Sequence, residues 1–311
     1  MEVRRDGLLE QTVPGRLIDR LVLRADTQIS SSTLAALADA GIGVVAFGGR
    51  GGHRVAHVLG APHNDPRARI AQCRLDVNDL QVISFVRQVV RAKVLRQRRF
   101  LRSVERPDLR KALRDADASL EKTLGAMASA SDVEAIRGFE GAAAAAYFRA
   151  YCALFPESLG FHARRRRPPP DPVNACLSLG YSVLYSEAVK ATWAAGLDPM
   201  VGALHRPAWG RASLACDLME PWRVVVDVWA WQMFRDREFR EEHFGRDGSG
   251  ALLMGKAARA KAYPALVLLM RNPARGLRRH ALRIATQLRG LPLSGWSEPS
   301  KADDRSPGSV A

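Results

Sequence analysis

Residues 80–102 read LQVISFVRQVVRAKVLRQRRFLR, and this stretch decides the class of fold. Leu80, Ile83, Val86, Val90 and Val94 recur at intervals of three and four residues, which is the period of an amphipathic helix. The remaining positions are strongly basic, and they include the following residues: Arg87, Arg91, Lys93, Arg96, Arg98, Arg99 and Arg102. The stretch therefore predicts a long helix with one face in the core and the other face carrying positive charge.

The composition of the whole chain extends this picture. The chain has 311 residues, of which 47% are apolar, and 47 Lys and Arg stand against 32 Asp and Glu. That length suits two domains, and the net charge of +15 indicates an anionic partner such as nucleic acid. We expect no membrane span, because no apolar run nears the ~18 residues that one needs, and the N-terminal residues lack a signal-peptide core. We therefore expect a cytoplasmic protein.

The first 73 residues predict a small domain that is rich in strands. Residues 17–23 and 42–47 are short apolar runs typical of strands. Between them, serines at 30–32 can cap a short helix that Gly41 would end. A glycine-rich turn at residues 48–52 precedes residues 53–59, which could return as a hairpin. This turn lacks the Gly-Lys-Ser/Thr end of a phosphate-binding P-loop, so we expect no nucleotide site there.

Residues 74–290 predict a larger, all-helical domain. Ser131 to Glu134 form a capping box, and Asp171 followed by Pro172 is typical of a helix start. Pro221 should kink or split a helix that begins near Ser213. Residues 259–289 predict one or two basic helices, interrupted at Pro264 and near Pro273. The fold class is thus α+β, mostly α, and residues 291–311 are expected to be a disordered tail.

Two further features of the sequence lie outside this helical pattern. Residues 164–167 are four arginines followed by three prolines, which predicts a basic loop. The four cysteines, Cys73, Cys152, Cys176 and Cys216, form no C-x-x-C pair, so we expect small buried thiols rather than a zinc site.

Glu140 is the first residue that is a candidate for chemistry. It lies in residues 137–148, RGFEGAAAAAYF, early in an expected helix. The glycines and alanines would let another helix or backbone pack very close. A carboxylate in such surroundings is costly to bury unless a cation meets it. That cation is either a metal ion or an arginine, such as Arg137 or one on another helix.

His205, Asp217 and Glu220 are the other candidates. Residues 196–205, GLDPMVGALH, form a turn rich in glycine and proline that delivers His205. In residues 213–223, SLACDLMEPWR, Asp217 and Glu220 are three apart and share a helix face. Their charges repel unless a cation or proton relieves them, and a solvated acidic face paired with Arg223 is the simpler alternative. The other six histidines are expected to be ordinary core or surface residues.

Taken together, these residues suit divalent-metal phosphoryl chemistry. Such chemistry needs hard oxygen ligands, an imidazole in some sites, and open positions for water and phosphate. Glu140, His205 and either Asp217 or Glu220 would supply that set from three helical segments. The surrounding Lys and Arg would hold a polyanion.

At these residues the sequence resembles the CRISPR-associated integrase family, the universal adaptation endonuclease that inserts new spacers into the repeat array. The resemblance rests on the three segments quoted above, in order, on NACLSLGYSVLY at 174–185, and on ISSSTLAALADAGIGVVAF at 29–47. It covers roughly residues 13 to 290. The resemblance implies a β-rich N-terminal domain that forms a homodimer, and a helical catalytic domain. It also implies a larger complex with the small second CRISPR-associated adaptation protein.

The resemblance assigns roles to the candidate residues. Glu140, His205 and Glu220 match the family's metal ligands, for Mg2+ or Mn2+, and Asp217 matches a neighbouring acidic residue that affects activity. The histidine mildly favours Mn2+. Family members usually begin with two or three strands before the segment matched by residues 13–23, and this chain offers about a dozen residues for them. A shortened N-terminal sheet is therefore expected.

The expected reaction is attack on a DNA phosphodiester, by the 3′-hydroxyl of incoming protospacer DNA at the CRISPR repeat or by water. Arg91, Arg98, Arg165 and Arg166 are candidates for backbone contacts, which set affinity rather than sequence choice. A basic, non-catalytic nucleic-acid-binding scaffold and an inactive family member are the alternatives. The scaffold does not explain why two acids and a histidine lie on supports rich in glycine and alanine.

Overall fold

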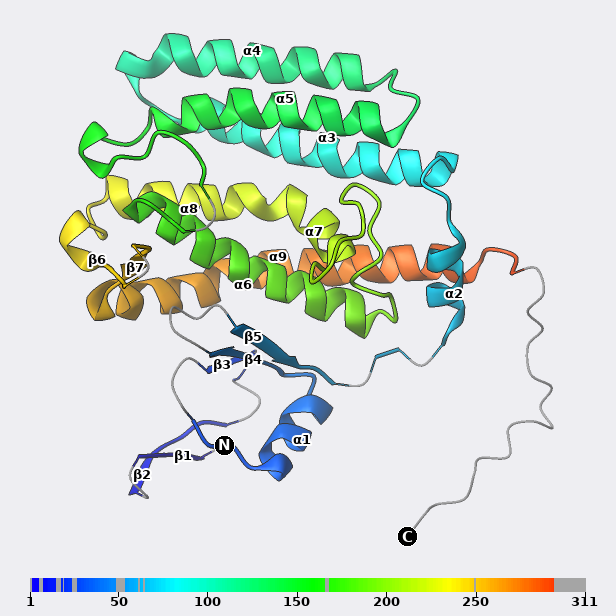
Figure 1. Ribbon diagram of the computed structural model, residues 1–311, viewed down its shortest axis with the longest axis vertical. Coiled ribbons are helices and arrows are strands. Elements are labelled where there is room, and N and C mark those ends of the chain that lie inside the picture. The colour runs from blue at the N-terminus through cyan, green and yellow to red at the C-terminus, as the bar shows by residue number, and fades with distance from the viewer. Residues whose placement is uncertain are drawn as a thin grey trace.

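The protein is described by a computed structural model that covers residues 2–5, 8–14, 18, 20–23, 27–48, 54–60, 62–63, 65–165, 168–248 and 250–293. Figure 1 shows a small strand-rich part at one end and stacked helices above it. Two hydrophobic cores match this division, a small one around Leu37, Ile42 and Val44 and a large one that begins at Ala68. The predicted α+β class, mostly α, is confirmed.

Among its described residues, the small part contains two separate sheets. Strands β1 (Glu2–Arg5) and β2 (Leu8–Thr12) pair with each other, antiparallel. Strand β4 (Gly43–Gly48) lies between β3 (Arg20–Leu23), which is parallel to it, and β5 (Arg54–Val58), which is antiparallel. The crossover between β3 and β4 is helix α1 (Ser31–Asp39), capped by the Ser30 side chain. The sequence was expected to leave too little room for the family's first strands. The first twelve residues nevertheless form two strands, β1 and β2.

The large part is built from helices. Those that make its core are α2 (Arg67–Arg74), α3 (Leu80–Ser103), α4 (Arg110–Met127), α5 (Val133–Cys152), α6 (Pro172–Ala194), α7 (Ser213–Met219), α8 (Arg223–Arg235) and α9 (Lys256–Arg289). In Figure 1, α3, α4 and α5 form one layer, α6, α7 and α8 lie below it, and α9 lies against α6 and crosses it in this view. The predicted boundary between residues 73 and 74 falls at the end of α2, whose Ala68 and Ala71 pack in the helical core.

Helix α3 follows the predicted period with one exception. Ile83, Val86, Val90 and Val94 are buried, whereas Leu80 is 85% exposed. Leu80 is the first residue of the helix, where no neighbouring element covers it. The helix crosses the middle of the domain, so its buried face contacts α4, α5 and α8.

Prolines have different effects at two places. Pro221 splits the predicted helix into α7, the one-turn helix η5 (Glu220–Trp222) and α8, as expected. The predicted interruptions at Pro264 and Pro273 are wrong, because α9 continues through both residues. A stripe that repeats every four residues, including Ala258, Ala262 and Leu266, is buried along α9 and packs chiefly against α6. This packing offsets the lost backbone hydrogen bonds, each an otherwise costly defect.

Three smaller findings complete the fold. The large part is not purely helical, since β6 (Phe244–Arg246) and β7 (Leu252–Met254) form a short antiparallel hairpin. Among the cysteines, Cys176 is buried as expected, but Cys73 is exposed. Within the described part of the chain, no helix has the length and apolar composition needed to cross a bilayer.

Candidate active site

Helix α5 positions Glu140. The helix begins after Asp132, whose side chain accepts a hydrogen bond from the Ala135 N–H at 2.8 Å, so the predicted start is confirmed. The expected tight packing at the glycines beside Glu140 is wrong. A Cβ atom added at Gly138 or Gly141 would meet nothing within 4 Å, because this side of α5 faces outward. Glu140 therefore stands at the edge of an open surface, with a side chain that is 25% exposed.

The loop before α7 positions His205, and Asp217 fixes the loop. Asp217 is fully buried, and its carboxylate accepts hydrogen bonds from the N–H groups of Ala203, Leu204 and His205 at 2.7, 3.1 and 2.8 Å. The same carboxylate lies 2.7 Å from the His205 Nδ1 atom. When Nδ1 carries the proton and donates it to Asp217, Nε2 is left free as a ligand or base.

Gly202 explains why this loop needs glycine. A Cβ atom at residue 202 would lie 2.5 Å from the carbonyl carbon of Ser213 and 2.7 Å from the nitrogen of Leu214. The loop therefore packs directly on the backbone at the start of α7. This contact brings His205 within reach of both acidic residues of α7 and η5.

Glu220 lies at the break between α7 and α8, and its side chain is only 4% exposed. Its Oε1 atom is 3.7 Å from His205 Nε2 and 2.6 Å from Arg223 Nε. Two ligands of one metal ion, each ~2.1 Å from it, lie about 3–4 Å apart. The spacing of Glu220 and His205 is thus compatible with a shared ion.

Lys93 completes the site, and the sequence did not single it out. The sequence pattern places Lys93 among the basic residues of 80–102 that are expected to be exposed. In the structure Lys93 lies three residues after Val90, on the buried side of α3, and is 8% exposed. Its ammonium forms an ion pair with Glu140 and another with Glu220, at 2.6 Å from Glu220 Oε2. The signal that could have found it is a lysine in phase with the apolar stripe.

The site therefore contains alternating charges held out of water. Burial alone would lower the pKa of Lys93, but the carboxylates of Glu220 and Glu140 outweigh burial and raise it. Burial alone would raise the pKa of Glu220, yet the charges of Arg223, Lys93 and His205 hold it well below its usual value. Both groups are charged at neutral pH, as buried ion pairs require.

The types of donor atom in the site, two carboxylates and one imidazole, suit a divalent metal ion. Glu140, His205 and Glu220 come from α5, the loop and η5; the two glutamates share the Lys93 ammonium, and His205 lies beside Glu220. Outside its ion pair, the buried Oε2 atom of Glu220 has no hydrogen-bond partner in the part of the chain that the structure describes. Within the described residues, no three His, Cys, Asp or Glu side chains lie close enough together to be a ready-made metal site. The Lys93 ammonium lies where Glu140 and Glu220 would share an ion.

A further buried carboxylate is connected to the site through Arg223. Asp227 on α8 accepts hydrogen bonds from the hydroxyls of Tyr147, at 2.9 Å, and Tyr181. Burial raises the pKa of Asp227 to about 6, although the tyrosine hydroxyls and Arg223 favour its charged form. The Arg223 guanidinium stacks over the Tyr181 ring at 4.9 Å. This network connects Arg223, and through it Glu220, to the core.

The four arginines expected to contact DNA differ in the structure. Arg98 is 8% exposed and pairs with Asp117 and Glu121 of α4 at 2.8 and 3.0 Å. Arg91 and Arg165 are exposed, and Arg166 lies outside the described residues. Within the same loop, Arg164 donates to Asn174 at 2.8 Å, so the first arginine turns inward onto α6.

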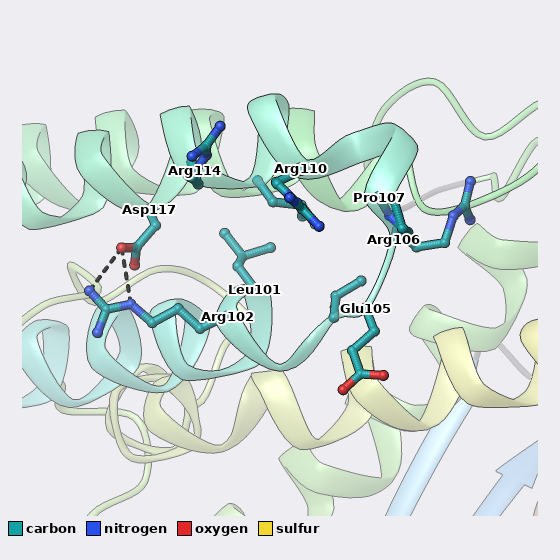
Figure 2. A pocket seen from close by; sticks show the side chains of 10 residues that line it. Leu101, Arg102, Glu105, Arg106, Pro107, Arg110, Arg114 and Asp117 are labelled. Atoms are coloured by element: carbon teal, nitrogen blue, oxygen red, sulfur yellow. Dashed lines mark hydrogen bonds and ion pairs between the residues drawn. The ribbon is translucent and has the colours of Figure 1, made fainter.

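A basic cavity that the sequence did not reveal lies between the end of α3 and the start of α4. Its volume is about 460 Å³, and its lining includes Arg102, Arg106, Arg110 and Arg114. Figure 2 shows these residues along the hollow, with Arg102 bound to Asp117. Arg106 pairs with Asp108 at 2.6 Å. Arg110 and Arg114 are one helical turn apart and exposed, so they are the arginines best placed to meet a ligand.

Comparison with known proteins identifies the family of this chain. The sequence-family model described as CRISPR associated protein Cas1 matches residues 1–266. The CRISPR-associated endonuclease Cas1 1 of Thermodesulfovibrio yellowstonii is 34% identical over 265 residues, which are 83% of this chain and 82% of that protein.

Two solved structures have a similar fold. A CAS1 protein from Thermotoga maritima superposes with a TM-score of 0.74 at 22% identity, over 92% of this chain and 91% of that one. A chain of a Cas6-RT-Cas1–Cas2 complex gives 0.76 at 23% identity, over 92% of this chain and 33% of that one. The matched region contains all four candidate catalytic residues, and the chain belongs to the Cas1 family of CRISPR-associated endonucleases.

Proposed function

We propose that this protein is a metal-dependent DNA endonuclease and integrase that inserts new spacer DNA into a CRISPR repeat array. The observation that carries the proposal is that Glu140 and Glu220 meet at one buried cation, Lys93, while His205 Nε2 lies 3.7 Å from Glu220 Oε1. A scaffold that only bound DNA would have no need for two carboxylates and an oriented imidazole there. An inactive family member would not need to keep the Asp217 contact that orients His205.

In the proposed reaction, a DNA phosphodiester meets the open side of the site beside Glu140. The 3′-hydroxyl oxygen of the incoming strand forms a new bond to phosphorus, and the 3′-oxygen of the target strand leaves. In simple cutting, water replaces the hydroxyl. A bound Mg2+ or Mn2+ would polarise the phosphate and stabilise the charge that develops on it.

The protein's own residues prepare this site. Asp217 holds the proton of His205 on Nδ1, so that Nε2 faces Glu220. Arg223 keeps Glu220 ionised despite its burial. Glu140, His205 and Glu220 would hold the ion, and Asp217 is a positioning residue that touches neither ion nor DNA.

The test is a nicking and strand-joining assay on a plasmid, with Mn2+, Mg2+ or EDTA. Wild-type protein should give metal-dependent products, whereas Glu140→Ala and His205→Ala should give none while still binding DNA. Lys111→Ala, an exposed change on α4, is the control and should behave like wild type. Products from His205→Ala at the wild-type rate would remove His205 from the site. Firm DNA binding without products in any metal would favour the scaffold.

The basic cavity between α3 and α4 is proposed to bind the DNA backbone. Arg102 is nine residues beyond Lys93, which is about 14 Å along the axis of α3. The cavity is therefore a separate contact that positions DNA without taking part in the reaction. Exposed arginines bind phosphate and release counterions, which makes affinity depend on salt.

This contact is tested by the double variant Arg110→Gln/Arg114→Gln. The slope of log affinity against log salt should become less steep by about 1.5–2, because two phosphate contacts are lost. The control is Lys111→Gln/Lys122→Gln, which removes the same charge from another face of α4 and should leave the slope nearly unchanged. Equal slopes for the two double variants would show that only net charge matters.

The partners are proposed from the family. One structural neighbour is part of a Cas6-RT-Cas1–Cas2 complex. We expect this chain to form a homodimer through its N-terminal strands and to bind the small second adaptation protein together with protospacer and repeat DNA. Light scattering of the purified protein, alone and with that partner, tests both expectations. A monomer at micromolar concentration would contradict the dimer.

A further inference from the structure

The Lys93 side chain is the feature of the site that the metal hypothesis leaves unexplained. Lys93 reaches from α3 into the space between α5 and η5, and its side chain is 9% exposed. Its ammonium pairs with Glu140 on one side and lies 2.6 Å from Glu220 Oε2 on the other. These are the two carboxylates proposed to share the metal ion.

The ammonium and a divalent ion cannot both occupy this position. Two cations within about 3 Å of each other in a poorly hydrated site repel strongly. Glu220 is balanced on its other oxygen by Arg223 at 2.6 Å, so Lys93 is the cation that Glu140 and Glu220 hold in common. A metal ion that binds both carboxylates must therefore take the place of the ammonium.

The surroundings allow the lysine to leave. Its flexible four-carbon stem can swing the charged end while its base stays in the core. Glu140 is 25% exposed, and the neighbouring Gly138 and Gly141 leave the surface beside it open. An ammonium displaced in that direction would reach the side from which a DNA phosphate approaches.

We infer that Lys93 is an internal counter-ion that competes with the catalytic metal for Glu140 and Glu220. Without metal, the ammonium holds the two carboxylates together and prevents their repulsion. When Mg2+ or Mn2+ binds, Lys93 moves out toward solvent and the incoming phosphate. Lys93 thereby weakens metal binding and keeps the metal-free site folded. This inference rests on the proposed metal site.

The first experiment measures Mn2+ binding by the loss of the free-ion electron paramagnetic resonance signal. Wild type is compared with Lys93→Met, which keeps the stem and removes the charge. The Kd for Mn2+ should fall about tenfold or more in Lys93→Met, because one buried competing charge is gone. Lys111→Met, an exposed lysine on α4, is the control for net charge and should leave the Kd unchanged.

The outcomes separate the inference from the proposed function. If wild type binds Mn2+ and Lys93→Met binds it equally or more weakly, Lys93 supports the metal site and the competition is refuted. If wild type does not bind Mn2+, or His205→Ala binds it as well as wild type, the proposed metal site itself fails. Thermal unfolding adds a second readout, since Mn2+ should raise the Tm of Lys93→Met more than that of wild type.

A measurement on the unaltered protein covers the case in which Lys93→Met does not fold. An amine-reactive reagent followed by mass spectrometry reports how accessible Lys93 is in EDTA and in Mn2+. Labelling of Lys93 should increase severalfold with Mn2+, while labelling of Lys111 stays constant. Equal protection of Lys93 under both conditions would show that the ammonium does not leave, and would overturn the inference.

Discussion

The substitution Asp217→Asn removes charge and one acceptor oxygen from the residue that fixes the active-site loop. In the structure, one oxygen of Asp217 accepts from the N–H groups of Ala203 and Leu204, at 2.7 and 3.1 Å. The other oxygen lies 2.8 Å from the N–H of His205 and 2.7 Å from its Nδ1. An asparagine presents one oxygen and one NH2 group, so either orientation turns the NH2 toward two of these nitrogens.

The magnitude follows from these contacts. Hydrogen bonds to charged groups contribute about 1.5–3 kcal/mol each, so losing two costs about 3–6 kcal/mol before the loop relaxes. Because Asp217 is fully buried, water cannot replace the lost acceptors. If the NH2 faces His205, the imidazole must accept at Nδ1 and carry its proton on Nε2. That tautomer cannot bind a metal through Nε2, because Nε2 then carries the proton.

Urea unfolding and Mn2+ binding together provide the assay. Asp217→Asn should lose about 3 kcal/mol or more of unfolding free energy and should bind Mn2+ at least tenfold more weakly. The control is Asp198→Asn in the same loop, where the carboxylate accepts a single exposed hydrogen bond from the Met200 N–H. It should change stability by less than ~1 kcal/mol. An Asp217→Asn variant as stable as this control, with wild-type metal affinity, would show that Asp217 neither holds the loop nor orients His205.

Three further predictions concern positions around the site. Gly202→Ala should destabilise the protein by about 1–3 kcal/mol and abolish nicking, because its Cβ would lie 2.5 Å from the backbone of Ser213. A variant with wild-type Tm and activity would contradict this close contact between the loop and the start of α7. Gly138→Ala should raise unfolding free energy by about 0.5–1 kcal/mol, since it faces open space on α5, and a loss would contradict that exposure. For Asp227, burial raises the pKa to about 6, so its protonated form stabilises the fold below pH 4 and that stabilisation is lost as pH rises through 6. The unfolding free energy of Asp227→Asn relative to wild type should therefore rise by about 3 kcal/mol between pH 4 and pH 7 in urea titrations. No change with pH would show that the Asp227 carboxylate is solvated and that burial does not raise its pKa.

Local sequence patterns predicted the elements that carry the site. The serine and acidic residues at 131–134 predicted the start of α5, although Asp132 rather than Ser131 caps it, and Pro221 predicted the break after Met219. The spacing of Asp217 and Glu220 likewise placed both on one face, and both contact His205. These features depend on neighbours within a few residues along the chain.

Long-range packing decided the features that sequence reasoning missed. Lys93 and Arg98 lie among exposed arginines such as Arg91 in the sequence, and the positions of α4, α5 and η5 decide which carboxylates they pair with. Pro273 stays within α9 because the helix packs on α6, which a local breaker rule cannot include. The sequence therefore predicted Glu140, His205 and Glu220 as metal ligands but did not predict that Lys93 lies between the two glutamates.

The most direct test of a metal site at Glu140, His205 and Glu220 is an anomalous difference map from a crystal grown with Mn2+. We expect one strong peak about 2.2 Å from His205 Nε2 and from an oxygen of each glutamate, with Asp217 bound only to His205. The Lys93 ammonium should then lie outside the coordination sphere. A manganese peak that lacks these ligands, or an occupied site elsewhere with the Lys93 ion pairs intact, would contradict the account.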